Sequence, residues 1–257
     1  MPATLNESAR GVYVICVTPF TDDGALDLAS TATMVEFMLA RGVDGLTVLG
    51  ILGEATKLTA DESERFVARV LDVVAGQVPV VVGVLQDPPV STGVQMPVSA
   101  MLRIVAAHPT CVMIKHEECP GLAKLSAMRA ASQRGEVRRV SILTGNGGGL
   151  FLPEELSRGA DGAMTGFAYP EMMVDVCREH AGGDVERAHD LFDAYLPLAR
   201  YEQQAGIGLA VRKHLLRQRG AIASAALRRP GPRLGAADVA DIERLVARQA
   251  RRLAQLD

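Results

Sequence analysis

The sequence contains no tryptophan, and aromatic residues make up only 4% of its 257 residues. Surfaces that stack nucleic-acid bases depend on aromatic side chains, and a formal net charge of −3 provides no positive field for a polyanion. We therefore expect neither nucleic acid nor a membrane surface as a partner. No apolar run approaches the ~20 residues of a membrane helix, and no signal-type segment opens the chain, so a cytoplasmic location is predicted.

Cysteine and lysine are also scarce. The four cysteines show no C-x-x-C spacing, which favours free thiols in a reducing compartment. Only four of the 27 basic residues are lysines: Lys57, Lys115, Lys124 and Lys213. Because arginine supplies nearly all positive charge, the position of each lysine is informative.

Lys115 closes the apolar run 111–114, which has the pattern of a buried strand. Burial disfavours an ammonium group, so a lysine there must find a partner or lose its proton. A neutral amine attacks carbonyl carbons, which makes Lys115 a candidate for Schiff-base formation. The alternative is an ordinary lysine whose long side chain reaches solvent at the end of a strand.

Short apolar runs alternate with amphipathic stretches of helical period, which is typical of parallel βα units. The predicted strands are 11–17, 46–49, 78–84, 111–115, 140–144 and 163–166, and 78–84 is apolar enough for burial on both faces. Helices are predicted at 28–41, after Thr59 with Glu62 as its capping-box partner, and at 98–107, 124–133 and 153–158. The pattern predicts a barrel domain over 1–170 and a helical region over 171–257 packed on it.

Several motifs follow one another along the chain. They are Thr18-Pro19-Phe20 with Asp23-Gly24, Gly50-Ile51-Leu52-Gly53-Glu54, Pro89 with Thr92-Gly93, Ile114-Lys115, Thr144-Gly145, Gly159-Ala160-Asp161-Gly162 with Thr165, and Arg229-Pro230. In this order and spacing they resemble the dihydrodipicolinate synthase and N-acetylneuraminate lyase family of class I lyases. The resemblance covers most of the chain.

This resemblance implies an α/β fold, a (β/α)8-type TIM barrel with a C-terminal helical extension. It implies a lyase, aldolase or hydro-lyase that needs no cofactor and works as a homo-oligomer. The substrate would be a small 2-oxo acid, of the pyruvate or 2-keto-3-deoxy sugar acid type, bound as a Schiff base on Lys115. The implied substrate-binding residues are Gly50, Ile51, Leu52, Gly53, Gly145, Met164 and Thr165.

Some positions depart from the family pattern. Gln86 stands where the family has its catalytic tyrosine, and an amide is neither an acid nor a base at neutral pH. Ile51 and Leu52 replace hydroxyl residues. Substitute acid or base groups could be Asp87, His116, Glu117 or Glu118, or Tyr13 or Tyr169 could reach the lysine. A second hypothesis is therefore a catalytically impaired member that binds 2-oxo acids without turnover.

The spacing between the third and fourth predicted strands is short. About two βα units, on the order of 45 residues, have no counterpart between Val84 and Leu85. Either a segment is missing from this sequence or the protein has lost it. In both cases we expect Lys115 on the inner face at the carboxyl end of the strands, within reach of Gly50 to Gly53, Gln86, Gly145 and Thr165.

The sequence offers two other kinds of site. The run His116-Glu117-Glu118-Cys119 contains metal-ligand types, but successive strand residues point to opposite sides and cannot converge on one ion. We therefore expect no metal. The glycine-rich run 145–149 could hold a phosphate, as loops after late barrel strands often do. It lacks a strongly capped helix behind it, and in the family it lines the 2-oxo acid pocket.

Overall fold

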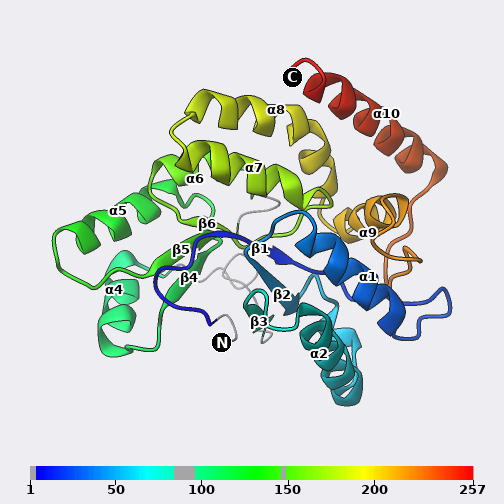
Figure 1. Ribbon diagram of the computed structural model, residues 1–257, viewed down its shortest axis with the longest axis horizontal. Coiled ribbons are helices and arrows are strands. Elements are labelled where there is room, and N and C mark those ends of the chain that lie inside the picture. Colours follow the sequence, from blue (N-terminus) through cyan, green and yellow to red (C-terminus); the bar gives the residue numbers. More distant parts are fainter. Residues whose placement is uncertain (1–3, 84–95, 146–148, 257) are drawn as a thin grey trace.

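The computed structural model describes residues 4–83, 96–145 and 149–256. Within them, six parallel strands form one sheet at the centre of the molecule, with helices around it (Figure 1). The strands are β1 (Gly11–Ile15), β2 (Gly45–Leu49), β3 (Val80–Gly83), β4 (Met113–His116), β5 (Ser141–Thr144) and β6 (Gly162–Ala163). The helices are α1 (Leu28–Leu39), the 3-10 turn η1 (Ala55–Lys57), α2 (Ala60–Val74), α4 (Val98–Ala107), α5 (Leu122–Gln133), α6 (Leu152–Ser157), α7 (Pro170–Ala181), α8 (Val185–Glu202), α9 (Gly208–Gln218) and α10 (Ala236–Leu253).

The strands lie in the order β3-β2-β1-β6-β5-β4. β1 pairs with β2, with Val14 opposite Leu46, and with β6, with Val12 opposite Ala163. The first and last strands in the sequence therefore join the two halves of the sheet. Among the described residues, no strand pairs with the outer edges of β3 and β4.

The two faces of the sheet carry different side chains because successive strand residues point to opposite sides. Val12, Val14, Leu46 and Val48 belong to the main core, which they share with the surrounding helices. The other face carries a smaller cluster of Tyr13, Leu143 and Met164, against which Val81 of β3 and Met113 of β4 both pack. Side chains from both edge strands thus meet in one inner cluster, so the sheet curves like the wall of a barrel.

Several local predictions are confirmed. All six predicted strands are present, although the last is regular only over Gly162–Ala163. Helix α4 has the predicted bounds, and Thr59 caps α2, where its side chain accepts from the Glu62 N–H at 3.2 Å while the Glu62 carboxylate accepts from the Thr59 N–H at 2.9 Å.

The prediction that 78–84 is buried on both faces is wrong for its described part. β3 is the outermost strand among the described residues, its burial is intermediate, and Val82 is 47% exposed. A run of valines maximises strand propensity whether or not a neighbour covers it. Composition therefore identified the strand but not its place in the sheet.

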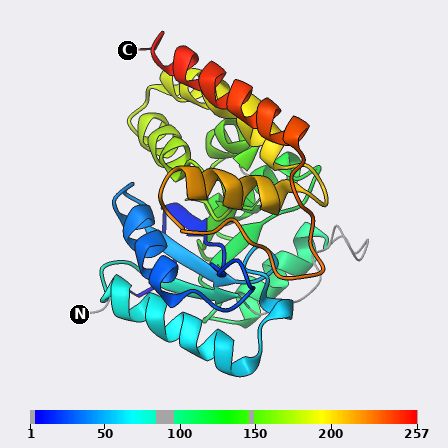
Figure 2. The same ribbon diagram turned by 90° about the vertical axis from the view of Figure 1, so that its right-hand side faces the viewer.

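The C-terminal helices pack on one another over the sheet, with α8 against α7 and α10 against α8 (Figure 2). Helix α7 also packs on β1, so it spans the predicted boundary at residue 170, and the division into two domains stays a prediction.

Helices in the described ranges are too short or too polar to cross a membrane. The join at Val84-Leu85 and Gln86 lie outside the described residues.

Candidate active site

Lys115 lies at the carboxyl end of β4. Its neighbour Met113, two residues earlier, packs in the inner cluster, so the alternation of the strand places Lys115 on the same inner face. Ile114 packs on the opposite side against residues of the outer helices. The His116 ring also faces outward, with Nε2 3.0 Å from the Gly121 carbonyl oxygen. The predicted orientation of Lys115 thus agrees with the packing of its neighbours.

Two contacts define the position of the lysine side chain. Its Nζ lies 2.9 Å from the Glu117 carboxylate, and its stem lies over Gly145. A Cβ added at Gly145 would be 2.8 Å from Lys115 Cε and 3.1 Å from Glu117 Cβ. The absence of a side chain at Gly145 therefore leaves room for Lys115 and Glu117, and any other residue there would displace them.

Lys115 is less enclosed than the apolar run 111–114 suggested. The side chains of Lys115 and Glu117 are 32% and 42% exposed. Within the described residues, β4 is the last strand of the sheet on its side, which is consistent with this exposure. Lys115 is paired with Glu117, as expected for a lysine at the end of an apolar strand. Glu117 is also one of the residues that could take over the role of the family tyrosine.

The polar side chains of residues 116–118 point to different partners. The His116 ring contacts the Gly121 carbonyl, Glu117 pairs with Lys115, and Glu118 pairs with Lys124. Within the described part of the chain, no group of three or more metal-ligand residues comes together. The run 116–119 thus splits into separate structural contacts, and Glu117 is the acidic residue that faces the lysine.

The turn after β2 lies at the same rim, because parallel strands end on one side of the sheet. Leu49 and Gly50 have left-handed φ angles of 61° and 72°, which bend the chain sharply. Thr18 Oγ1 donates to the Gly53 carbonyl at 2.6 Å, and the Ala55 N–H donates to the Gly50 carbonyl at 3.1 Å. The N–H groups of 51–53 donate no hydrogen bond to another described residue. They are therefore available to a carboxylate.

Glu54, the last residue of this turn, is held in place by buried contacts. Its carboxylate is buried and pairs with Lys213 of α9 at 2.7 Å and with Lys57 at 3.0 Å, and it also accepts from the Arg228 N–H at 3.1 Å. Burial lowers the pKa of Lys213, and the charge of Glu54 opposes that shift. We call Glu54, Lys57, Lys213 and Arg228 the Glu54 cluster.

Arg228 connects three of the motifs seen in the sequence. Its guanidinium donates to the Gly24 carbonyl at 2.9 Å, to the Lys57 carbonyl at 2.7 Å and to both carboxylate oxygens of Glu62. This pairing lowers the pKa of Glu62 to about 2. The opening motif, the Gly50–Glu54 turn and the late arginine-rich turn are therefore held together in space.

Sequence reasoning missed a buried ion pair at this rim. Arg212 Nε lies 2.6 Å from Glu202, and the same arginine donates to the Gly166 carbonyl at 2.5 Å. Both residues line a cleft of about 230 Å³ whose other wall includes Ile51 and Leu52. A buried charge in the last turn of α8 and another in α9 were the available signals, but pairing them requires the fold.

The other predicted residues lie as follows. Met164 is in the inner cluster, and Thr165 is buried with its carbonyl accepting from the Ile15 N–H at 2.9 Å. Tyr13 lies in the same cluster, and the Tyr169 ring packs against Phe167 in a tilted arrangement, with 5.6 Å between ring centroids. Among the described residues, neither tyrosine is hydrogen-bonded to Lys115, and no contact of Lys115 with Gly50 to Gly53 is seen. That Thr165 lies within reach of Lys115 stays a prediction.

Comparison with known proteins adds to this geometry. A sequence model of the dihydrodipicolinate synthetase family matches residues 8–87. A crystal structure of dihydrodipicolinate synthase from Rhodopseudomonas palustris is 36% identical and superposes with a TM-score of 0.92 over 96% of this chain and 99% of that one. The chain belongs to the dihydrodipicolinate synthetase family. Its relatives there are lyases and dehydratases, and this chain is accordingly a lyase-type enzyme.

Two curated relatives extend the comparison. The L-2-keto-3-deoxyarabonate dehydratase of Azospirillum brasilense is 28% identical over 279 residues, which covers 88% of this chain and 89% of the relative. A 4-hydroxy-tetrahydrodipicolinate synthase of Thermotoga sp. (strain RQ2) is 26% identical over 247 residues, covering 74% of this chain and 82% of the relative. The first alignment is longer than the 257 residues of this chain, so that dehydratase carries segments that this chain lacks.

Proposed function

We propose that this protein forms a Schiff base between Lys115 and a 2-oxo acid and uses it to cleave or dehydrate a substrate of the 2-keto-3-deoxy sugar acid type. The observation that carries the proposal is the Lys115–Glu117 pair at the carboxyl end of β4, with 2.9 Å between amine and carboxylate. A carbonyl-reactive amine and a proton-transfer group are thereby adjacent at the carboxyl rim, where barrel enzymes do their chemistry.

Imine formation uses the lysine directly. The neutral amine adds to the C2 carbonyl of the substrate, and the resulting carbinolamine loses its hydroxyl as water to leave an iminium ion. Only the unprotonated amine can attack, and Glu117 is placed to take the lysine proton. The iminium nitrogen then draws electrons from the neighbouring C3–H or C3–C4 bond.

We assign the substrate carboxylate to the turn after β2. The unengaged N–H groups of 51–53 supply donors, and the glycines at 50 and 53 allow close approach. These donors act through the backbone, so replacing the family's hydroxyl residues by Ile51 and Leu52 leaves them in place. The cleft beside Arg212 adds polar surface for the hydroxyl-bearing end of the substrate.

Glu117 is proposed as the acid and base of the reaction. In a dehydration it takes the C3 proton, giving an enamine, and returns a proton to the C4 hydroxyl as that group leaves as water. The distance of 2.9 Å to the nitrogen lies within proton-transfer reach. The near full-length similarity to a 2-keto-3-deoxyarabonate dehydratase supports dehydration as the first reaction to test.

The test is reductive trapping followed by turnover. Incubation with pyruvate and borohydride should fix a reduced adduct on Lys115, which peptide mass spectrometry locates. Lys115→Arg should abolish the adduct, because a guanidinium stays protonated. Lys124→Arg is the matched control, since Lys124 is also paired with a glutamate, Glu118. An adduct that persists in Lys115→Arg would refute the assignment.

Turnover then separates the two hypotheses. Release of product from a 2-keto-3-deoxy pentonate or hexonate supports an active enzyme. An adduct on Lys115 without turnover of any such substrate, or of a pyruvate-plus-aldehyde pair, would establish an impaired member that only binds 2-oxo acids.

We further propose that two βα units are truly absent and that the protein is a homo-oligomer. The R. palustris structure supports the first point, because 96% of this chain matches 99% of that one and the two are therefore of nearly equal length. An intact mass and a sedimentation experiment on the purified protein would test both.

A further inference from the structure

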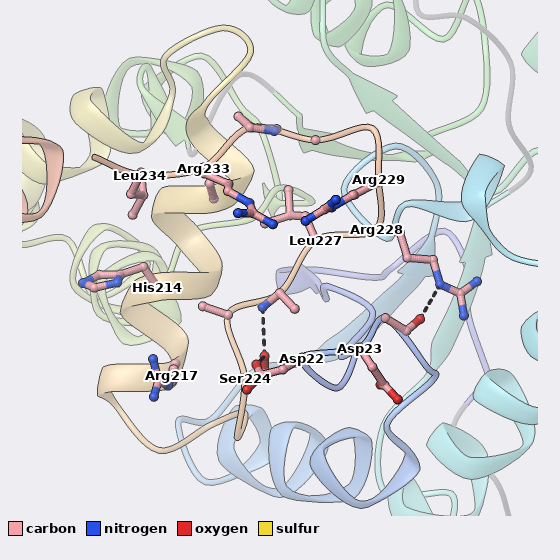
Figure 3. Close-up of a pocket in the computed structure, with 16 residues that line it drawn as sticks. Asp22, Asp23, His214, Arg217, Ser224, Leu227, Arg228, Arg229, Arg233 and Leu234 are labelled. Atoms are coloured by element: carbon pink, nitrogen blue, oxygen red, sulfur yellow. Dashed lines mark hydrogen bonds between the residues drawn. The ribbon is translucent and has the colours of Figure 1, made fainter. Parts of the chain in front are cut away.

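A second cavity lies away from the Lys115 rim. It measures about 560 Å³ and lies between α9, the loop 22–24 and the extended segment 224–234 (Figure 3). Pockets that bind small molecules usually have volumes of roughly 300–1,000 Å³. None of the proposed catalytic residues lines it.

The wall of this cavity carries an excess of positive charge. Arg217 of α9 and Arg228, Arg229 and Arg233 of the extended segment line it, against two acidic residues, Asp22 and Asp23. Arg228 is neutralised by Glu62. Among the described residues, the other three arginines face the cavity without a paired acid.

The two acidic residues are already engaged by hydrogen bonds. Asp22 Oδ1 accepts from the Ser224 hydroxyl at 2.5 Å, and the Asp23 carboxylate accepts from the Thr21 hydroxyl and from the Ala25 N–H at 3.3 Å. By contrast, Arg217, Arg229 and Arg233 make no hydrogen bond or ion pair with any described residue. Their guanidinium donors are available to a ligand.

Two of the arginine side chains are oriented for a shared ligand. Arg229 and Arg233 extend toward one another from the two ends of their loop, and Arg228 and Asp23 point away from them (Figure 3). Like charges that face each other repel, and an anion between them replaces repulsion with attraction. His214, on the α9 wall, also lines the cavity, and its buried Nε2 is unpartnered within the described residues.

We propose that this cavity is a binding site for a small organic polyanion with at least two carboxylate or phosphate groups. Arg229 and Arg233 hold one group, and Arg217 of α9 holds the other. Guanidinium groups suit both kinds of anion because their forked donors match two acceptor oxygens at once. The site is independent of the proposed imine chemistry.

The experiment is calorimetric titration of the full chain at constant ionic strength with malonate, citrate, inorganic phosphate and pyrophosphate. We expect saturable binding of one molecule per chain by at least one dianion or trianion. The double variant Arg229→Gln, Arg233→Gln should weaken it about 100-fold or more, since removing one charge-assisted hydrogen bond weakens binding roughly tenfold. The ranking of carboxylates against phosphates identifies the ligand class.

The matched control is Arg248→Gln, Arg251→Gln on α10, which removes the same charge from exposed arginines that are likewise unpaired among the described residues. It should leave the affinity within about twofold. Both double variants change exposed side chains, and circular dichroism would confirm that they are folded. Equal affinity in the two variants, or no saturable binding of any of the four anions, would overturn the proposal.

Discussion

At the rim of the sheet, the charged residues after β2 and after β4 are held very differently. On the β2 side, the Glu54 and Lys213 side chains are 2% and 0% exposed. Both belong to the Glu54 cluster, which joins segments far apart in the sequence. On the β4 side, Lys115 and Glu117 are about a third and two fifths exposed, and both come from one strand end. The β2 side is thus a fixed support beneath the turn that we propose for the substrate carboxylate. The β4 side leaves Lys115 and Glu117, the proposed reactive groups, accessible to solvent.

The largest expected effect concerns the accessible side. Replacing Glu117 with glutamine keeps the shape and the hydrogen-bond acceptor but removes the ability to carry a proton. Turnover should fall about 100- to 10,000-fold, the usual range for a lost acid or base, while stability changes little. Steady-state kinetics with borohydride trapping would check it, because the imine should still form, though more slowly.

Glu118→Gln serves as the control for Glu117→Gln, because Glu118 is the next residue along but faces Lys124. Its turnover should stay close to that of the parent protein. A Glu117→Gln variant with unchanged turnover would mean that the proton passes through another group. The difference between the exposed pair after β4 and the buried pair after β2 would then affect the stability of the protein and not its catalysis.

The next effect concerns the buried side. Lys213→Met leaves the Glu54 carboxylate without its closest partner in a dry environment. Removing one member of a buried pair usually costs about 3–5 kcal/mol. Urea unfolding should show this loss, and Arg65→Met, which breaks an exposed pair with Asp61, should cost less than about 1 kcal/mol. Equal losses would show that burial does not distinguish the two sides.

The smallest effect is a pH dependence. The pKa of Glu62 is lowered from its ordinary value of 4.5 to about 2 in the folded protein, chiefly by its hydrogen bonds with Arg228. A lowered pKa means that the stabilisation is fully present above pH 4.5 and is lost as the pH falls toward 2. Solvent screening limits it to about 1 kcal/mol.

Unfolding measured from pH 6 to pH 2.5 would show the contribution of Glu62. The stability of Glu62→Gln should be lower at pH 6 and should converge with that of the parent as the acid limit is approached. Parallel curves over the whole range would rule out this contribution.

Local patterns in the sequence were sufficient for much of the fold. The bounds of α4, the Thr59 cap and the six strands depend on neighbouring residues, and so they could be predicted. The exposure of β3 could not, because it depends on which strand lies beside it. Lys115 and Gly145 were predicted as site residues, and their contact is now seen.

The long-range contacts could not be predicted from the sequence. Glu54 and Lys213 are 159 residues apart, and nothing local to either one indicates the other. The scarcity of lysine was a signal that Lys213 was special, but it gave no partner. The arginine-lined cavity likewise exists only after α9 and the segment 224–234 are folded together.

The pairing of β1 with β6 has a consequence for synthesis. Gly11 lies opposite Gly162, so β1 is synthesised about 150 residues before the strand that pairs with one of its edges. This pairing also excludes any side chain at Gly162, since a Cβ there would lie 1.9 Å from the Gly11 carbonyl oxygen. Strand pairs of such large sequence separation form late. Until then β1 is paired with β2 alone, and its other edge stays open to unwanted strand pairing.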